Sequence, residues 1–186
     1  GGKTVTSIAA GVFEDNISIP KAVLPDSIRR IGDRAFKGCL NLAEINIPQS
    51  LESIGQEAFS RCASITSILL PDTVTSIGKG AFSYCRNLAD LVLPSSSKIT
   101  KIEDETFRGC GFSQIALPDT VREIGKQAFY WCDNLETVSF SDSLVTIGEE
   151  AFYSCNSLEQ AILPDSVTSI GGAAFSGPQQ SMKGAC

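Results

Sequence analysis

Residues 73–94 read TVTSIGKGAFSYCRNLADLVLP, and the same wording returns along the chain. Residues 166–175 read SVTSIGGAAF, and residues 4–13 read TVTSIAAGVF. Recurrence of one segment is typical of a repeat architecture, in which each unit is one small structural element. The period of the recurrence therefore decides the fold.

The repeat is anchored by an isoleucine, most often followed by glycine. Eight copies occur, at spacings of 23, 23, 23, 25, 22, 23 and 23 residues. A phenylalanine follows each isoleucine after five positions, and in the six central copies a cysteine follows three positions later. The chain is therefore predicted to form about eight coils of 23 residues, called repeats 1 to 8 below. Their anchors are Ile8, Ile31, Ile54, Ile77, Ile102, Ile124, Ile147 and Ile170.

One unit contains two short extended segments and two turns. In residues 65–70, Ile68 and Leu70 are two positions apart, which is the spacing of one strand face. Residues 74–77 suit a second extended segment. Pro71-Asp72 between them favours a turn, because Pro fixes φ and Asp bonds its own backbone. We expect Gly78 to adopt a left-handed conformation that ends the second segment. Residues 81–85 predict about one helical turn with Phe and Cys on one face.

Such a unit cannot bury its apolar residues alone, whereas stacked units cover one another. The pattern resembles the BspA-like leucine-rich repeat, and residues 42–64 (LAEINIPQSLESIGQEAFSRCAS) and 158–175 (LEQAILPDSVTSIGGAAF) follow that unit almost letter for letter. The resemblance implies a repeat solenoid of mostly short β-strands with short helical turns. We expect one leucine-rich repeat domain over residues 1–177, degenerate at both ends, and a tail or linker at 178–186.

Repeat 5 departs from the regular period. Residues 94–99 (PSSSKI) contain two more residues than the corresponding stretch of repeat 4, and Phe112 follows Cys110 after two steps rather than three. Small changes in length of this kind are expected in surface loops, where they cost little free energy.

Composition excludes several classes of function. The net charge of −6 disfavours nucleic acid as a partner, because binding it requires neutralising phosphates with Lys and Arg. Histidine is absent, which removes the commonest catalytic base and metal ligand. No apolar run is long enough to insert into a membrane. We therefore expect no enzyme activity, no cofactor and no metal.

Seven cysteines raise the question of disulfides. Six of them occupy the same place in successive repeats, so their side chains should point the same way along a ladder rather than toward each other. We interpret them as small buried apolar residues beneath the phenylalanines. Cys186 lies outside this ladder, with a free thiol, an intermolecular bridge or the edge of the fragment all open.

The outward position on the first extended segment provides one set of candidate binding residues. Its second to fourth residues along the chain are Asn46, Leu69 and Val92. Two adjacent apolar side chains facing water suggest a contact surface. The alternatives are that flanking sequence covers them, or that they only reflect β-propensity.

The two positions after the phenylalanine provide the second set. All of the tyrosines and the one tryptophan of the chain lie there, and Tyr130 and Tyr153 should occupy adjacent rungs with Trp131 beside them. Tyr and Trp dominate binding hot spots, because they bring a large rigid area at low entropy cost. The alternative is that they only shield the edges of the coils. The set is Tyr84, Tyr130, Trp131 and Tyr153.

An extended surface without an enclosed pocket favours binding a macromolecule. BspA-like proteins are surface or secreted proteins of bacteria and some protists, associated with adhesion. The resemblance therefore implies a cell-surface or secreted protein-recognition module, with a host matrix or cell-surface protein as partner. The alternatives are a structural spacer or self-association module of a larger surface protein, and an accessory module of an enzyme.

Overall fold

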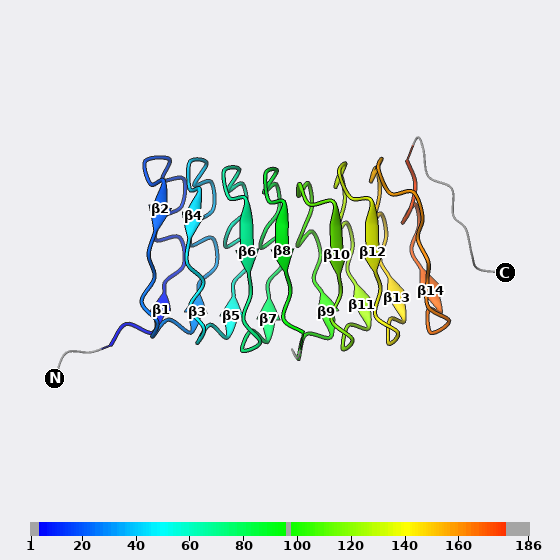
Figure 1. The fold of residues 1–186 in the computed structure, drawn as a ribbon, viewed down its shortest axis with the longest axis horizontal. Helices are drawn as coiled ribbons and strands as arrows, with labels where there is room; N and C mark the ends of the chain where they lie inside the picture. Colours follow the sequence, from blue (N-terminus) through cyan, green and yellow to red (C-terminus); the bar gives the residue numbers. More distant parts are fainter. Residues whose placement is uncertain (1–3, 96–97, 178–186) are drawn as a thin grey trace.

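The computed structural model describes residues 4–95 and 98–177. The chain winds through coils that lie side by side, in sequence order, from the N-terminal to the C-terminal end of an elongated molecule (Figure 1). All regular elements of the described residues are short β-strands, in two rows. The predicted tail at 178–186 lies outside the described residues.

The lower row in Figure 1 contains the isoleucine anchors. Its strands are β1 (Ser7–Ile8), β3 (Arg30–Ile31), β5 (Ser53–Ile54), β7 (Ser76–Ile77), β9 (Lys101–Ile102), β11 (Glu123–Ile124), β13 (Thr146–Ile147) and β14 (Ser169–Ile170). The upper row contains β2 (Lys21–Ala22), β4 (Glu44–Ile45), β6 (Ser67–Leu69), β8 (Asp90–Val92), β10 (Gln114–Ala116) and β12 (Thr137–Ser139).

Neighbouring strands pair in parallel, one repeat apart. Ile31 is opposite Ile54, and Ile54 is opposite Ile77. The lower row forms two four-stranded sheets, β1-β3-β5-β7 and β9-β11-β13-β14, and the upper row forms the pairs β2-β4, β6-β8 and β10-β12. The predicted β-solenoid of roughly 23-residue repeats is therefore confirmed, with about seven turns connecting the eight anchors.

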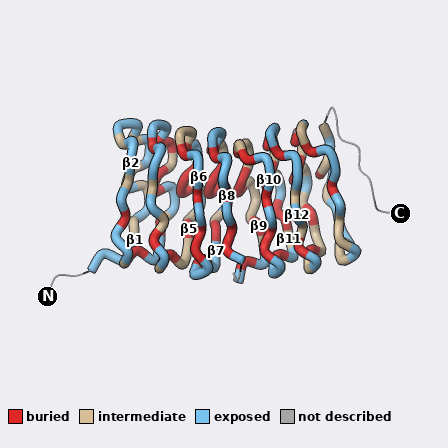
Figure 2. The backbone as a smooth tube through the Cα atoms, viewed as in Figure 1, coloured by how far each residue is buried: buried red, intermediate tan, exposed pale blue. Residues whose placement is uncertain are grey.

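The core is a set of columns that run along the whole stack (Figure 2). Phenylalanines of successive repeats stack with ring centroids 4.9–5.9 Å apart, from Phe13 to Phe175. Phe112, in the shortened loop of repeat 5, contacts Phe107 and Phe129 edge-on. It stands where other repeats have Leu or Ile, and it is fully buried.

The predicted helical turn is wrong, because the described residues contain no helix. In repeat 2 the Phe36 N–H donates to the Ala58 carbonyl at 2.8 Å and the Gly38 N–H donates to the Ser60 carbonyl at 2.8 Å, both in the next coil. The alternating N–H groups of Ala35, Lys37 and Cys39 donate to carbonyls three residues earlier. Residues with left-handed backbone lie at both ends of this turn, Arg34 (φ 56°) and Gly38 (φ 72°). The equivalent positions of repeats 1 and 3 to 7 are also left-handed. Alternate N–H groups are thus turned toward the neighbouring coil, which a helix does not permit.

The role predicted for the glycine after the isoleucine is also wrong. Gly55 and Gly78 do not have positive φ. A Cβ at Gly55 would lie 2.5 Å from the Asp33 nitrogen, and a Cβ at Gly78 would lie 2.6 Å from the Gln56 nitrogen. Glycine is needed here because the backbones of adjacent coils approach too closely for any side chain.

The one internal exception to this glycine supports the explanation. Repeat 5 has Glu103 after its isoleucine, and β7 and β9 on either side of this step belong to different sheets. The extra residues of the 94–99 loop immediately precede β9. Where the insertion interrupts the sheet, the close approach of the coils is relaxed and a side chain is accommodated.

The six repeat cysteines are buried and free, as predicted. Each thiol lies 3.0–3.1 Å from the carbonyl oxygen of the phenylalanine one coil earlier, as Cys85 does from Phe59. The S–H is a weak donor, so the ladder gives these carbonyls a second hydrogen bond without a polar side chain in the core. Burial raises the pKa of Cys85 and Cys132 to about 12.

We predict that Gly55→Ala lowers the free energy of unfolding by about 1–3 kcal/mol or more, because the new methyl group collides with backbone. Gly172→Ala is the matched control, since no atom lies within 4 Å of its Cβ position. The control should change stability little or raise it slightly. Urea unfolding followed by circular dichroism measures both, and equal effects of the two substitutions would contradict the explanation.

We predict that Cys85→Ala costs about 1–3 kcal/mol at pH 7, and that this cost shrinks in alkali. The unfolded thiol ionises near pH 8.5, whereas the folded one stays protonated to about pH 12. The wild type therefore loses about 1.4 kcal/mol of Cys85 stabilisation for each pH unit above about 8.5, and the variant does not. Parallel unfolding curves from pH 7 to 11 measure the difference. A cost independent of pH would show that the buried thiol titrates normally.

Candidate functional site

The predicted aromatic residues form one continuous cluster. Tyr130 and Tyr153 stack with centroids 5.0 Å apart and planes 10° apart, which confirms that they occupy adjacent rungs. Trp131 lies 5.1 Å from Tyr130 at a 50° tilt. The three tyrosines are partly buried, whereas 48% of Trp131 is exposed. The tyrosines therefore both cover the coil edge and offer a surface, with Trp131 as the most accessible member.

Arg108 joins Tyr84 to this cluster. Its guanidinium carbon lies 5.6 Å from the Tyr84 ring centroid and 4.7 Å from that of Tyr130. The same group donates to Gln127 Oε1 at 2.9 Å and pairs with Glu105 at 3.3 Å. Held between two rings and two acceptors, the guanidinium is fixed in place. We call the five residues Tyr84, Arg108, Tyr130, Trp131 and Tyr153 the aromatic ridge.

Sequence reasoning did not single out Arg108. It occupies the same position after the phenylalanine as Tyr130 and Tyr153, in the next repeat toward the N-terminus. That shared position was the available signal, since residues in one column must be neighbours. Tyr84 lies in the adjacent column, so its contact with Arg108 could be predicted only by knowing the direction of the Arg108 side chain.

Tyr84 and Trp131 have an unusual backbone for aromatic residues. Their φ angles are 61° and 60°, in the left-handed region that favours glycine. The Tyr84 N–H donates to the Arg108 carbonyl at 2.6 Å and the Trp131 N–H donates to the Tyr153 carbonyl at 2.9 Å. The stack of coils therefore dictates this conformation. Gly109 has the same position in the coil between them, which shows what the backbone alone would prefer.

The outward strand residues form a second exposed set. Leu69 and Val92 are opposite each other in the β6-β8 pair and are 60% and 53% exposed, which confirms that they lie side by side. We call these two residues the apolar pair. Asn46 is exposed too, but its amide bonds both backbone groups of Leu24 in the preceding coil, at 2.6 and 2.8 Å. Its side chain therefore continues the hydrogen bonding between these two coils just beyond the β2-β4 pair.

The charged side chains are arranged as pairs between neighbouring coils. Lys101 lies 2.9 Å from Glu123, and Lys126 lies 2.9 Å from Glu149. The hydrogen bond that each lysine donates to its carboxylate raises the pKa of the lysine. Such exposed pairs contribute little to stability. Within residues 4–95 and 98–177, no group of three His, Cys, Asp or Glu side chains could hold a metal ion, and no helix could cross a membrane.

Similar solved structures come from bacteria. A leucine-rich repeat protein of T. pallidum is 33% identical, with a TM-score of 0.77, over 89% of this chain and 75% of that one. A leucine-rich repeat protein of Bacteroides ovatus is 30% identical, with a TM-score of 0.75, over 96% of this chain. The match spans 52% of that protein, about half its length.

A protein of Faecalibacterium prausnitzii, described as a leucine rich cell surface protein, is 28% identical with a TM-score of 0.61, over 92% of this chain and 62% of that one. No curated protein matches the chain significantly. The sequence profile of the BspA type leucine rich repeat region (six copies) matches residues 6–100 and 77–183. The chain therefore belongs to the BspA-type leucine-rich repeat family.

Proposed function

We propose that this chain is a non-enzymatic recognition module that binds a protein ligand, in adhesion at a bacterial cell surface. The observation that carries the proposal is the aromatic ridge. It gathers every tyrosine and the one tryptophan of the chain on four successive coils, around a guanidinium held between two of the rings. The ligand class we favour is a host extracellular-matrix or cell-surface protein.

The composition and rigidity of the ridge support this proposal. Tyr, Trp and Arg are the residues most enriched in binding hot spots. The rings are ordered before any partner arrives, because Tyr130 stacks on Tyr153 and the backbone of each coil is bonded to the next. A partner therefore loses little side-chain entropy on docking here.

The backbone conformation of Trp131 also supports a role in binding. A left-handed Trp131 costs about 1–2 kcal/mol relative to glycine, and 48% of the residue remains exposed. Strain of this kind at an exposed aromatic residue favours a role in binding over a role in stability.

Location is supported by resemblance. The Faecalibacterium prausnitzii relative is described as a cell surface protein, and an adhesive role fits that location. The net charge of −6 suits a soluble exposed surface and opposes anionic partners such as nucleic acid. The apolar pair offers a second contact area, which a large ligand could reach.

Binding to immobilised matrix and host cell-surface proteins tests the proposal. Tyr130→Ala and Trp131→Ala should each weaken a detected interaction at least tenfold, as expected for hot-spot residues. Arg61→Ala is the matched control, because Arg61 is exposed and occupies the position of Tyr84 one coil earlier. Leu69→Ser with Val92→Ser tests the apolar pair.

The proposal fails if binding survives changes to both the ridge and the apolar pair, or if no protein of the panel binds. A structural spacer would be a monomer in sedimentation equilibrium and would bind no ligand. A self-association module would form an oligomer whose population depends on concentration. An oligomer that Leu69→Ser and Val92→Ser dissociate would favour self-association.

We predict that Trp131→Gly unfolds at a higher denaturant concentration than Trp131→Ala. Both substitutions remove the indole, but only glycine adopts φ near 60° without strain, so the difference should be about 1 kcal/mol. Equilibrium unfolding in urea measures it. A variant with alanine that is as stable as the one with glycine would mean that the left-handed backbone at residue 131 costs nothing.

A further inference from the structure

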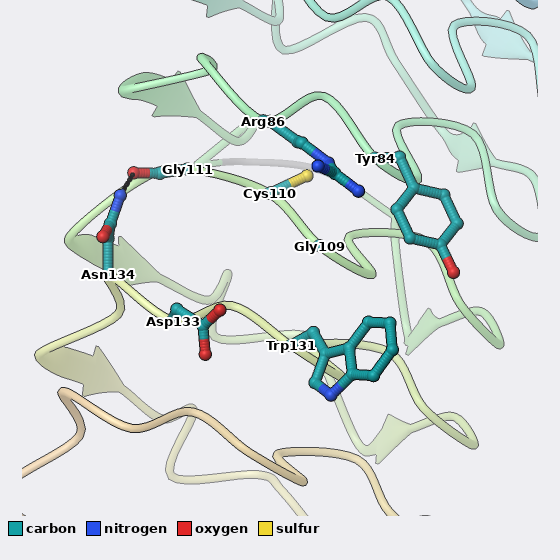
Figure 3. Close-up of a pocket in the computed structure, with 8 residues that line it drawn as sticks. All are labelled: Tyr84, Arg86, Gly109, Cys110, Gly111, Trp131, Asp133 and Asn134. Carbon is teal, nitrogen blue, oxygen red and sulfur yellow. Dashed lines mark hydrogen bonds between the residues drawn. The ribbon is translucent and has the colours of Figure 1, made fainter.

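A hollow of about 300 Å³ opens beside the aromatic ridge (Figure 3). Tyr84 and Arg86 form one wall, Trp131 and Asp133 form the other, and Gly109 to Gly111 form the floor. The walls thus come from repeats 4 and 6, and the floor comes from repeat 5 between them. Asn134 closes one end, where its amide donates to the Gly111 carbonyl at 3.2 Å. We call this the repeat-5 hollow.

The irregularity of repeat 5 creates the hollow. Tyr84, Gly109 and Trp131 share one position of the repeat, and Arg86, Gly111 and Asp133 share another. Large side chains on both neighbouring coils therefore face each other across a coil that has none. A Cβ at Gly111 would lie 2.0 Å from the Arg86 carbonyl oxygen, so the shortened loop requires glycine there. The floor is consequently backbone, and it stays open.

The charges at the hollow select its occupant. Arg86 is exposed and has no ion pair within 4.0 Å among the described residues, while Asp133 has one oxygen bonded to the Asn156 amide at 2.9 Å. A cationic occupant attracted to Asp133 would be repelled by Arg86, and an anionic occupant attracted to Arg86 would be repelled by Asp133. An apolar occupant would take both charges out of water without replacing their hydrogen bonds. A neutral group that both donates and accepts meets all these conditions.

The aromatic walls add a further requirement. Tyr84 and Trp131 lie on opposite sides of the hollow, and the negative charge density of an aromatic ring face attracts the polarised C–H groups of a saturated ring. We propose that the repeat-5 hollow binds a neutral hexopyranose unit of a glycan. The sugar ring would lie against Trp131 or Tyr84, its hydroxyl groups donating to Asp133 and accepting from Arg86. A volume at the lower end of the range of ligand pockets suits one sugar ring.

The intrinsic fluorescence of Trp131 tests this directly, because it is the only tryptophan in the chain. The probes are the methyl glycosides of glucose, galactose, mannose and N-acetylglucosamine. The comparison probes are anionic N-acetylneuraminic acid, cationic argininamide and neutral acetyl-glutaminamide. We expect a saturable change with at least one neutral glycoside, at millimolar concentration or below, and none with the charged probes.

Asp133→Ala and Arg86→Ala should each weaken the glycoside at least tenfold, whereas Arg61→Ala should leave it unchanged. All three residues are exposed, and unfolding curves check that each variant folds. The proposal is overturned if no glycoside changes the fluorescence, if only argininamide or acetyl-glutaminamide does, or if both hollow variants bind as the wild type does.

This inference goes beyond the proposed function, and the two can fail separately. Tyr153 neither lines the hollow nor has a ring contact with a residue that does, so its alanine variant reports on protein binding alone. Arg86 and Asp133 are outside the aromatic ridge, so their variants report on the sugar. Loss of glycoside binding in the Tyr153 variant, with Arg86 and Asp133 intact, would also count against the assignment of the hollow.

Discussion

The structure depends on the hydrogen-bonded register between neighbouring coils. The Gly55 N–H donates to the Ile31 carbonyl at 2.8 Å on the strand side, and the Phe36 N–H donates to the Ala58 carbonyl at 2.8 Å on the turn side. Each coil is therefore hydrogen-bonded to its neighbours on both the strand side and the turn side. These bonds fix the distance and the rotation of one coil relative to the next. Glycine after the anchor isoleucine permits the close approach, and the phenylalanine and cysteine columns follow from it. A stack of this kind has stability only as a whole, because no coil has a core of its own.

The same constraint explains why one irregular repeat has such visible consequences. An insertion in residues 94–99 separates β7 from β9, yet the Phe82 and Phe107 rings remain 5.9 Å apart and the Phe82 N–H still reaches the Thr106 carbonyl at 2.9 Å. The strand side of the solenoid is thus interrupted while the turn side is continuous. Glu103 lies at this discontinuity, and the repeat-5 hollow lies at the shortened loop of the same repeat. A regular stack would have neither, since every position would be occupied by a similar side chain at a similar spacing.

The sequence predicted whatever follows from the period alone. Residues 23 apart must lie on adjacent coils, so the contact of Tyr130 with Tyr153, the pairing of Leu69 with Val92 and the burial of the cysteines could be stated in advance. The turns were mistaken for helical ones because both place Phe and Cys on one side, and only the inter-coil hydrogen bonds distinguish them. The glycine after the isoleucine was explained by φ, because sequence cannot show how closely two backbones approach. The contacts of Arg108 and Asn46 were missed because they depend on side-chain direction.

A periodic molecule separates the residues that build it from those that vary on its surface. Isoleucine, phenylalanine and cysteine are repeated because every coil must fit the next, so they carry no information about a ligand. The positions at 84, 109 and 131 have the same left-handed backbone, yet they contain Tyr, Gly and Trp. The shared backbone does not select such different side chains, and it disfavours the aromatic pair. Neither side chain is required by the backbone at its position, which is the reason to look for a ligand on this edge of the solenoid.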